Sequence, residues 1–297
     1  MTYNHFHDNP LQNRIEHTID RLLDVGRGVP IGPLRAHRFG HDDHDHDGDD
    51  AEADILAQFA EQAEDLHERV VHEHGLFVAE FLGATGAGKT RLIERLIERA
   101  PEDETIGVIV GDVAGEDDAT RFRERGAQVA NVNTGKECHL DPEFVERGLS
   151  ELDLEALDTL YIENVGNMVC PADFPLGAQA RVLVVSTTEG DDVVRKHPLL
   201  FQTCDATVIN KTDIADAVGS DLDLMESDVG DISPEMPVFR TDAEHGNGVE
   251  DLRTFLNKRG HAHAHDHEGD VSKVAGHEQG HDGGHTHEHG EQTHTHD

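Results

Sequence analysis

The spacing of hydrophobic residues changes near residue 76. Between residues 51 and 71 apolar side chains recur at intervals of three and four, which predicts an amphipathic helix. After residue 76 short apolar runs alternate with helical stretches; the runs are 76–82, 105–111, 127–132, 158–163, 180–187 and 205–210. Buried strands joined by helical crossovers predict an α/β fold with a mostly parallel central sheet and helices on both faces.

The same pattern divides the chain into four segments. Residues 1–50 form an N-terminal extension with a predicted helix at 14–25, and its last ten residues, HDDHDHDGDD, are a predicted flexible linker. Residues 51–75 hold the amphipathic helix, whose stripe is expected to pack on the α/β domain of residues 76–258, closed by a helix at 252–258. Residues 259–297 alternate His with small and acidic residues, so this tail is predicted to be disordered.

The chain is strongly acidic. Its 297 residues carry 62 Asp and Glu against 24 Lys and Arg, a net charge of −38, which argues against nucleic acid and anionic membranes as partners. The α/β domain shares this acidity, and only six residues of the chain are Lys, which favours a halophilic protein over an ordinary acidic one. With three cysteines, no secretory signal and no apolar stretch of bilayer length, the expected location is the cytoplasm.

Residues 83–90, GATGAGKT, fit the G-x-x-x-x-G-K-[ST] pattern between a predicted strand and a predicted helix, which indicates a P-loop. Its glycines let backbone N–H groups face the phosphates at the positive end of the helix. Lys89 is expected to face solvent and the β/γ-phosphates rather than the core, and the Thr90 hydroxyl to bind Mg²⁺. The residues expected to contact nucleotide here are Gly83, Ala84, Thr85, Gly86, Ala87, Gly88, Lys89 and Thr90.

A second motif, Asn210-Lys211-Thr212-Asp213, follows the last predicted strand. The Asp213 carboxylate can accept the two hydrogens that guanine offers at N1 and N2, so Asn210, Lys211 and Asp213 are predicted to select GTP over ATP. A further purine contact is expected from the backbone N–H of Ala243, in a Asp-Ala-Glu sequence where GTPases more often have Ser-Ala-Lys.

Glu163 ends a predicted apolar strand at the position of the Walker-B motif, where Asp is commoner. Gly166 follows, near the expected position of the γ-phosphate. Asp112, at the end of another strand, is a second candidate for the magnesium shell, directly or through water. Lys89, Thr90, Asp112 and Glu163 are the predicted catalytic set. None of them is a strong general base, which favours slow hydrolysis suited to a switch.

Two cysteines lie beside these nucleotide elements. Cys138 and His139 are adjacent, and Cys170 lies seven residues beyond Glu163. Thiolate and imidazole suit nickel or zinc, and three ligands leave a site that a second subunit or water must complete. The alternative, small buried side chains, is less favoured because both loops are polar, whereas Cys204 is predicted to lie in the core.

Histidine is concentrated outside the α/β domain, with eleven residues in 261–297 and four more at His37, His41, His44 and His46. Such density favours binding of nickel, zinc or copper, so these segments are candidate metal stores.

The blocks TGKECHLD, IENVGNMVCPADFPLG, TEGDDVVRKHPLLF and INKTD, in this order over residues 76–258, resemble the HypB family of hydrogenase maturation GTPases. The resemblance implies a nucleotide-dependent homodimer that hydrolyses GTP to GDP and delivers nickel to a hydrogenase large subunit or another nickel accessory protein. It also implies that Cys138, His139 and Cys170 bind metal at the dimer interface. An N-terminal C-x-x-C-x-C nickel motif is missing, which puts the family's separate N-terminal site in doubt.

Two alternatives remain open. A urease accessory GTPase of the UreG type is related, but its signature is a single Cys-Pro-His motif rather than Cys-His with a distant Cys. A non-enzymatic nickel or zinc store explains the tail but not the P-loop or the NKTD sequence. Hydrolysis of guanine nucleotide separates an enzyme from a store.

Overall fold

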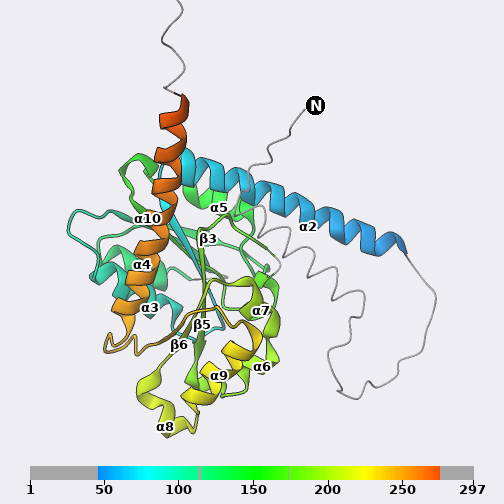
Figure 1. The fold of residues 1–297 in the computed structure, drawn as a ribbon, viewed down its shortest axis with the longest axis vertical. Helices are drawn as coiled ribbons and strands as arrows, with labels where there is room; N and C mark the ends of the chain where they lie inside the picture. Colours follow the sequence, from blue (N-terminus) through cyan, green and yellow to red (C-terminus); the bar gives the residue numbers. More distant parts are fainter. Residues whose placement is uncertain (1–45, 113–114, 173, 275–297) are drawn as a thin grey trace, which may run out of the picture. The chain divides into compact units, whose positions relative to one another are not determined.

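The structure, a computed structural model, describes residues 46–112, 115–172 and 174–274 (Figure 1). Within these ranges seven strands form one sheet in the order β3-β2-β4-β1-β5-β6-β7, and each neighbouring pair is parallel. The strands are β1 (Phe77–Leu82), β2 (Ile106–Asp112), β3 (Gln128–Asn133), β4 (Thr159–Glu163), β5 (Ala180–Ser186), β6 (Ala206–Asn210) and β7 (Val238–Arg240). The predicted α/β fold with a parallel sheet is confirmed.

Helices connect the strands and cover both faces of the sheet. They are α2 (His46–His67), α3 (Lys89–Glu98), α4 (Asp117–Arg123), α5 (Pro142–Leu149), α6 (Val193–Lys196), α7 (Pro198–Thr203), α8 (Ala215–Val218), α9 (Leu222–Ile232) and α10 (Val249–Val274). Over the described part of the chain, no helix is both long and apolar enough to cross a membrane.

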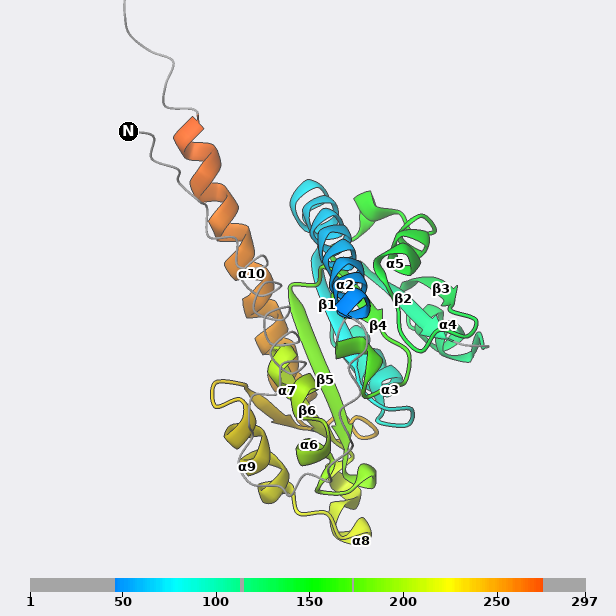
Figure 2. The same ribbon diagram turned by 90° about the vertical axis from the view of Figure 1, so that its right-hand side faces the viewer.

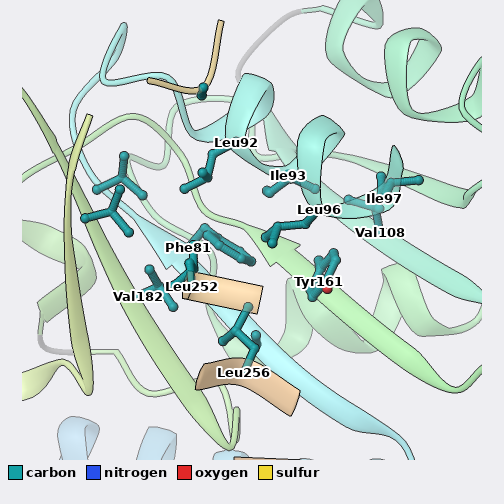
Figure 3. Close-up of a cluster of buried hydrophobic side chains, with 14 of the residues drawn as sticks. Phe81, Leu92, Ile93, Leu96, Ile97, Val108, Tyr161, Val182, Leu252 and Leu256 are labelled. Atoms are coloured by element: carbon teal, nitrogen blue, oxygen red, sulfur yellow. The ribbon is translucent and has the colours of Figure 1, made fainter. Parts of the chain in front are cut away.

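One face of the sheet packs against α3, α4 and the first turns of α10. Alternate residues of β1 point to opposite faces, so Phe81 enters this cluster while Leu82 enters another. Leu92 and Leu96 of α3 and Leu252 of α10 meet Phe81 there, as Figure 3 shows. This packing fixes the helix that leaves the P-loop against the strands that carry the other candidate site residues.

The other face carries two further clusters. Near β2 and β4 the sheet is covered by α5, by the end of α2 and by the π-helical segment Glu68–Glu73 that follows it; Leu66 of α2 and Val70 of this segment are buried there. Near β5 and β6 the covering helices are α6, α7 and α9. Figure 2 shows β1 and β5 between α10 and α2. The amphipathic stripe of residues 51–71 therefore packs on the domain that follows it.

Three boundaries differ from the prediction. Helix α2 begins at His46, so half of the segment expected to be a flexible linker is helical. Helix α10 begins at Val249 and continues to Val274, into the tail that was predicted to be disordered from residue 259. This segment contains no proline, and extending a helix that is already anchored costs less than starting one. The predicted helix at 14–25 and residues 275–297 lie outside the described residues.

The sequence pattern also missed β7. Its three residues are partly or fully exposed, and they pair with β6 at the edge of the sheet. A strand this short has too few residues to show the alternation that identifies longer strands.

Candidate nucleotide and metal sites

The P-loop connects β1 to α3 through three glycines with positive φ. The φ angles of Gly83, Gly86 and Gly88 are 142°, 82° and 97°. At Gly83 a Cβ atom would lie 2.1 Å from the Val184 carbonyl oxygen, so only glycine fits. The loop thereby brings the N-terminus of α3 close to the carboxyl end of the sheet, where helix dipole and backbone N–H groups favour a phosphate.

Lys89 lies closer to the protein interior than expected. Its side chain is 6% exposed, and its ammonium donates hydrogen bonds to the carbonyl oxygens of Gly83 (2.9 Å) and Ala84 (3.2 Å). Burial lowers the pKa of Lys89, and the nearby Glu163 opposes this shift. The prediction that Lys89 faces solvent is wrong, because the start of α3 packs under the loop; its charge nevertheless lies within the phosphate-binding loop.

Thr90 and Glu163 form the candidate magnesium site. The Thr90 hydroxyl donates to Glu163 Oε1 at 2.7 Å, across from the P-loop to the end of β4. Burial raises the pKa of Glu163 to about 7, although Lys89 opposes this shift. The second carboxylate oxygen, Oε2, is buried and has no hydrogen-bond partner among the described residues. A hydroxyl beside a carboxylate with an unused oxygen fits a hard cation such as Mg²⁺.

Asp112 ends β2, and its Oδ2 accepts a hydrogen bond from Gly115 N at 2.9 Å. Its carboxylate is therefore bonded to the backbone at Gly115, and its place in the magnesium shell stays a prediction.

Asn210 joins the P-loop to residues 241–244, the candidate guanine loop that follows β7. It is 1% exposed, donates from Nδ2 to the Ala87 carbonyl (2.9 Å), and accepts at Oδ1 from Thr241 Oγ1 (3.0 Å) and Ala243 N (3.1 Å). The Ala243 N–H, which was predicted to contact the purine, is therefore already bonded to Asn210. Asp213, by contrast, is exposed at the start of the segment after β6, as a base-reading carboxylate requires.

Glu244 explains the departure from Ser-Ala-Lys. Arg91 donates to both carboxylate oxygens of Glu244, from Nε and Nη2 at 3.1 Å each. Arg95, one turn further along α3, donates to the backbone carbonyls of Ala243 (2.9 Å) and Glu244. The acidic residue thus anchors the candidate guanine loop to the P-loop helix. Neither arginine was assigned to the site from the sequence, although their spacing of four residues on one helix was a usable signal.

The structure brings the three candidate metal ligands together. Cys138 and His139 follow β3, and Cys170 begins a 3₁₀ turn after β4. The two Sγ atoms lie 2.8 Å apart, Cys138 Sγ lies 3.8 Å from His139 Nδ1, and one ligand atom from each residue lies within 4.8 Å of the others. Burial lowers the pKa of His139, which favours the neutral imidazole that binds metals. The third cysteine, Cys204, packs against the apolar cluster below β5 and β6, as predicted.

Aromatic rings orient His139. Its imidazole stacks on Phe174, with ring centroids 3.8 Å apart and 18° between the planes. Phe59 of α2 meets the same Phe174 edge to face at 5.1 Å. Helix α2 therefore reaches the candidate metal site through two phenylalanines, neither of which was assigned to the site from the sequence.

The segment between Glu163 and Cys170 contacts both sites. Thr85 Oγ1 of the P-loop donates to Gly166 O at 3.1 Å, and a Cβ at Gly166 would lie 2.8 Å from the Thr85 backbone. One residue later, Asn167 forms a β-bridge with Gly83 and donates from Nδ2 to the Cys138 carbonyl at 3.2 Å. The P-loop and the metal-ligand loop are thus connected through adjacent residues.

A parallel sheet with a glycine-rich loop at its carboxyl edge, a buried lysine and a hydroxyl–carboxylate pair defines a P-loop nucleotide-binding protein. Residues 77–240 match the family model of the CobW/HypB/UreG nucleotide-binding domain. The chain is 45% identical over 194 residues to a probable hydrogenase maturation factor HypB from Methanocaldococcus jannaschii, covering 65% of this chain and 88% of the relative. It is also 34% identical over 209 residues to a hydrogenase/urease maturation factor HypB from Helicobacter hepaticus, covering 69% and 85%.

Solved structures agree with these sequence relatives. The HypB crystal structure from Archaeoglobus fulgidus superposes with a TM-score of 0.64 at 42% identity, covering 69% of this chain and 99% of that one. HypB from Helicobacter pylori, crystallised in complex with nickel, gives 0.65 at 32% identity, covering 69% and 96%. The chain belongs to the CobW/HypB/UreG family and, within it, to the HypB hydrogenase maturation factors, which confirms the resemblance drawn from the sequence.

Proposed function

We propose that this chain is a GTP-hydrolysing nickel metallochaperone of [NiFe]-hydrogenase maturation, in which nucleotide state controls dimerisation and metal transfer. The observation that carries the proposal is the short segment from Glu163 to Cys170. It contacts the P-loop through Gly166 and Asn167 and ends at a metal-ligand candidate. A nucleotide that moves this segment must also move Cys170.

The nucleotide half of the proposal assigns GTP as substrate and GDP and phosphate as products. Asp213 selects guanine, and Lys89 with the P-loop N–H groups neutralises the β- and γ-phosphates. Thr90 and Glu163, with Asp112 directly or through water, hold Mg²⁺, which when bound screens the charge of the phosphate oxygens. Gly166 lets the loop after β4 approach the γ-phosphate, because a side chain there would collide with Thr85.

The metal half assigns nickel as the cargo of Cys138, His139 and Cys170. The donor set suits nickel and also zinc, and the related Helicobacter pylori protein was crystallised with nickel. Three donors from one chain leave coordination positions for a second copy. Val169, next to Cys170, is 63% exposed, and an apolar side chain at this position supports a homodimer contact beside the metal. The proposed recipients are a hydrogenase large subunit or another nickel accessory protein.

The test is a nickel titration in the presence of GDP or of a non-hydrolysable GTP analogue. Absorption from nickel–thiolate bonds reports on Cys138 and Cys170 and excludes the imidazole sites of the histidine-rich tail. We expect the nickel affinity to differ about 5–150-fold between the two nucleotide states, the usual range of coupling between sites. By linkage, nickel must change the nucleotide affinity by the same factor. Oligomeric state is followed in parallel.

Cysteine variants provide the control. Cys138→Ala or Cys170→Ala should remove the thiolate absorption and the nucleotide dependence while nucleotide binding survives. Cys204→Ala is the matched control, since Cys204 packs against an apolar cluster and is not in the group of Cys138, His139 and Cys170. Equal nickel affinities in both nucleotide states of the wild type would refute the switch.

A further inference from the structure

Two opposite charges lie inside the sheet, where apolar residues are the rule. Glu80 of β1 and Arg181 of β5 are register partners in adjacent strands, and they are 0% and 5% exposed. Arg181 Nε donates to Glu80 Oε2 at 2.9 Å. A buried ion pair is seldom more stable than an apolar pair of similar size, so stability alone does not account for it.

One chain of hydrogen bonds runs from this ion pair to the loop of Cys138 and His139. Asn164, the residue after Glu163, donates from Nδ2 to Glu80 Oε1 at 2.8 Å. Its Oδ1 accepts from the backbone N–H of Leu140 at 3.0 Å. Leu140 directly follows His139, and Asn164 and Leu140 are 1% and 0% exposed. The end of β4 is therefore tied to one metal-ligand loop inside the protein.

A second chain of hydrogen bonds runs from the ion pair to the loop of Cys170. Arg181 Nη2 donates to the backbone carbonyl of Pro171 at 2.6 Å, and Pro171 directly follows Cys170. Each oxygen of Glu80 thus accepts one hydrogen bond: Oε1 from Asn164 and Oε2 from Arg181. The two loops that carry the thiols are therefore connected, through Asn164 and Arg181, to the same carboxylate.

We infer that Glu80, Asn164 and Arg181 are positioning residues that hold the two metal-ligand loops at ligating distance and link them to the end of the Walker-B strand. None of the three touches the metal; each fixes the backbone next to a ligand. The inference rests on the proposed function, because it assigns these residues to the metal site of Cys138, His139 and Cys170. Residues that orient metal ligands typically change metal affinity 10–100-fold when they are altered.

The main variant is Glu80→Gln in the full chain. In glutamine an NH₂ donor replaces one of the two carboxylate oxygens, so either Asn164 or Arg181 faces a donor instead of an acceptor, and one of the two hydrogen bonds is lost. Glu94→Gln is the matched control: Glu94 is also 0% exposed and is held by three arginines, Arg91, Arg121 and Arg125, none of which lies in a metal-ligand loop. Arg181→Lys is the second variant, because it keeps a cation beside Glu80 while it loses the reach to Pro171.

Two readouts separate positioning from general destabilisation. The first is nickel affinity measured by thiolate absorption, which should weaken about tenfold or more in Glu80→Gln and Arg181→Lys and stay at the wild-type value in Glu94→Gln. The second needs no metal: diamide oxidises the Cys138 and Cys170 thiols to a disulfide, with transfer of two electrons and two protons to the diazene. The rate of this reaction should fall in both network variants and not in the control.

Wild-type nickel affinity and wild-type diamide rates in a folded Glu80→Gln or Arg181→Lys protein would overturn the inference. If Glu80→Gln does not fold, Arg181→Lys decides by the same two readouts. If the nickel affinity of the wild type is the same with GDP and with the GTP analogue, the proposed switch is refuted. The inference is then still tested by comparing the nickel affinities of the variants with that of the wild type. A wild type that binds no nickel through thiolates leaves the decision to the diamide rates.

Discussion

Asn210→Ala should be among the most destabilising single changes on the nucleotide side of the molecule. The amide makes three buried hydrogen bonds, to the carbonyl of Ala87 and from Thr241 and Ala243. Alanine leaves all three partners without it, and each buried polar group without a partner costs about 1–3 kcal/mol. Allowing for relaxation of the Thr241 hydroxyl, we expect a loss of about 3–5 kcal/mol in the free energy of unfolding, in the range reserved for broken buried networks.

The assay is urea denaturation without nucleotide, followed by circular dichroism, with the slope of the transition checked for a common value in both proteins. Asn131→Ala is the control: Asn131 is only partly buried, and its Nδ2 donates one hydrogen bond, to Gly115 O at 2.8 Å. It should cost about 1 kcal/mol. An Asn210→Ala protein within 1 kcal/mol of the wild type would show that the amide does not join the P-loop to the guanine loop.

Two further predictions concern the base and the thiols. Asp213→Asn replaces a carboxylate acceptor with an amide, so affinity should shift from GTP to xanthosine triphosphate in competition binding; an unchanged preference for guanine contradicts the assignment. Burial raises the pKa of Cys204 to about 12, so at pH 8 only about one molecule in 10⁴ carries the reactive thiolate. Iodoacetamide followed by mass spectrometry should therefore label Cys138 and Cys170 ahead of Cys204, with nickel protecting the first two, and early labelling of Cys204 contradicts the packing.

The elements that the sequence identified are those with a strong local signal. The P-loop has a fixed spacing of glycines and a lysine, and the six long strands have apolar runs, so both were found. The cluster of Cys138, His139 and Cys170 was predicted through the residues' shared position beside nucleotide motifs and through family resemblance, and the structure brings their ligand atoms within 4.8 Å of one another.

What the sequence missed depends on contacts between distant residues. Arg91 and Glu244 are 153 residues apart and meet only because α3 and the loop after β7 lie at the same edge of the sheet. Glu80 and Arg181 could be noticed in the sequence, since each is a lone charge within an apolar run. Their pairing, however, required the order of strands β1 and β5, which local spacing does not contain.

The attachment of the candidate guanine loop to α3 should depend on ionic strength in two different ways. The ion pair between Arg91 and Glu244 lies at the surface, where Glu244 is 67% exposed, and dissolved ions weaken such a pair. The hydrogen bonds from Arg95 go instead to uncharged backbone carbonyls, which salt screens far less. As salt concentration rises, the ion pair between Arg91 and Glu244 should therefore weaken, whereas the hydrogen bonds of Arg95 should persist. We therefore expect the candidate guanine loop to stay attached to α3 at low and at high salt concentration.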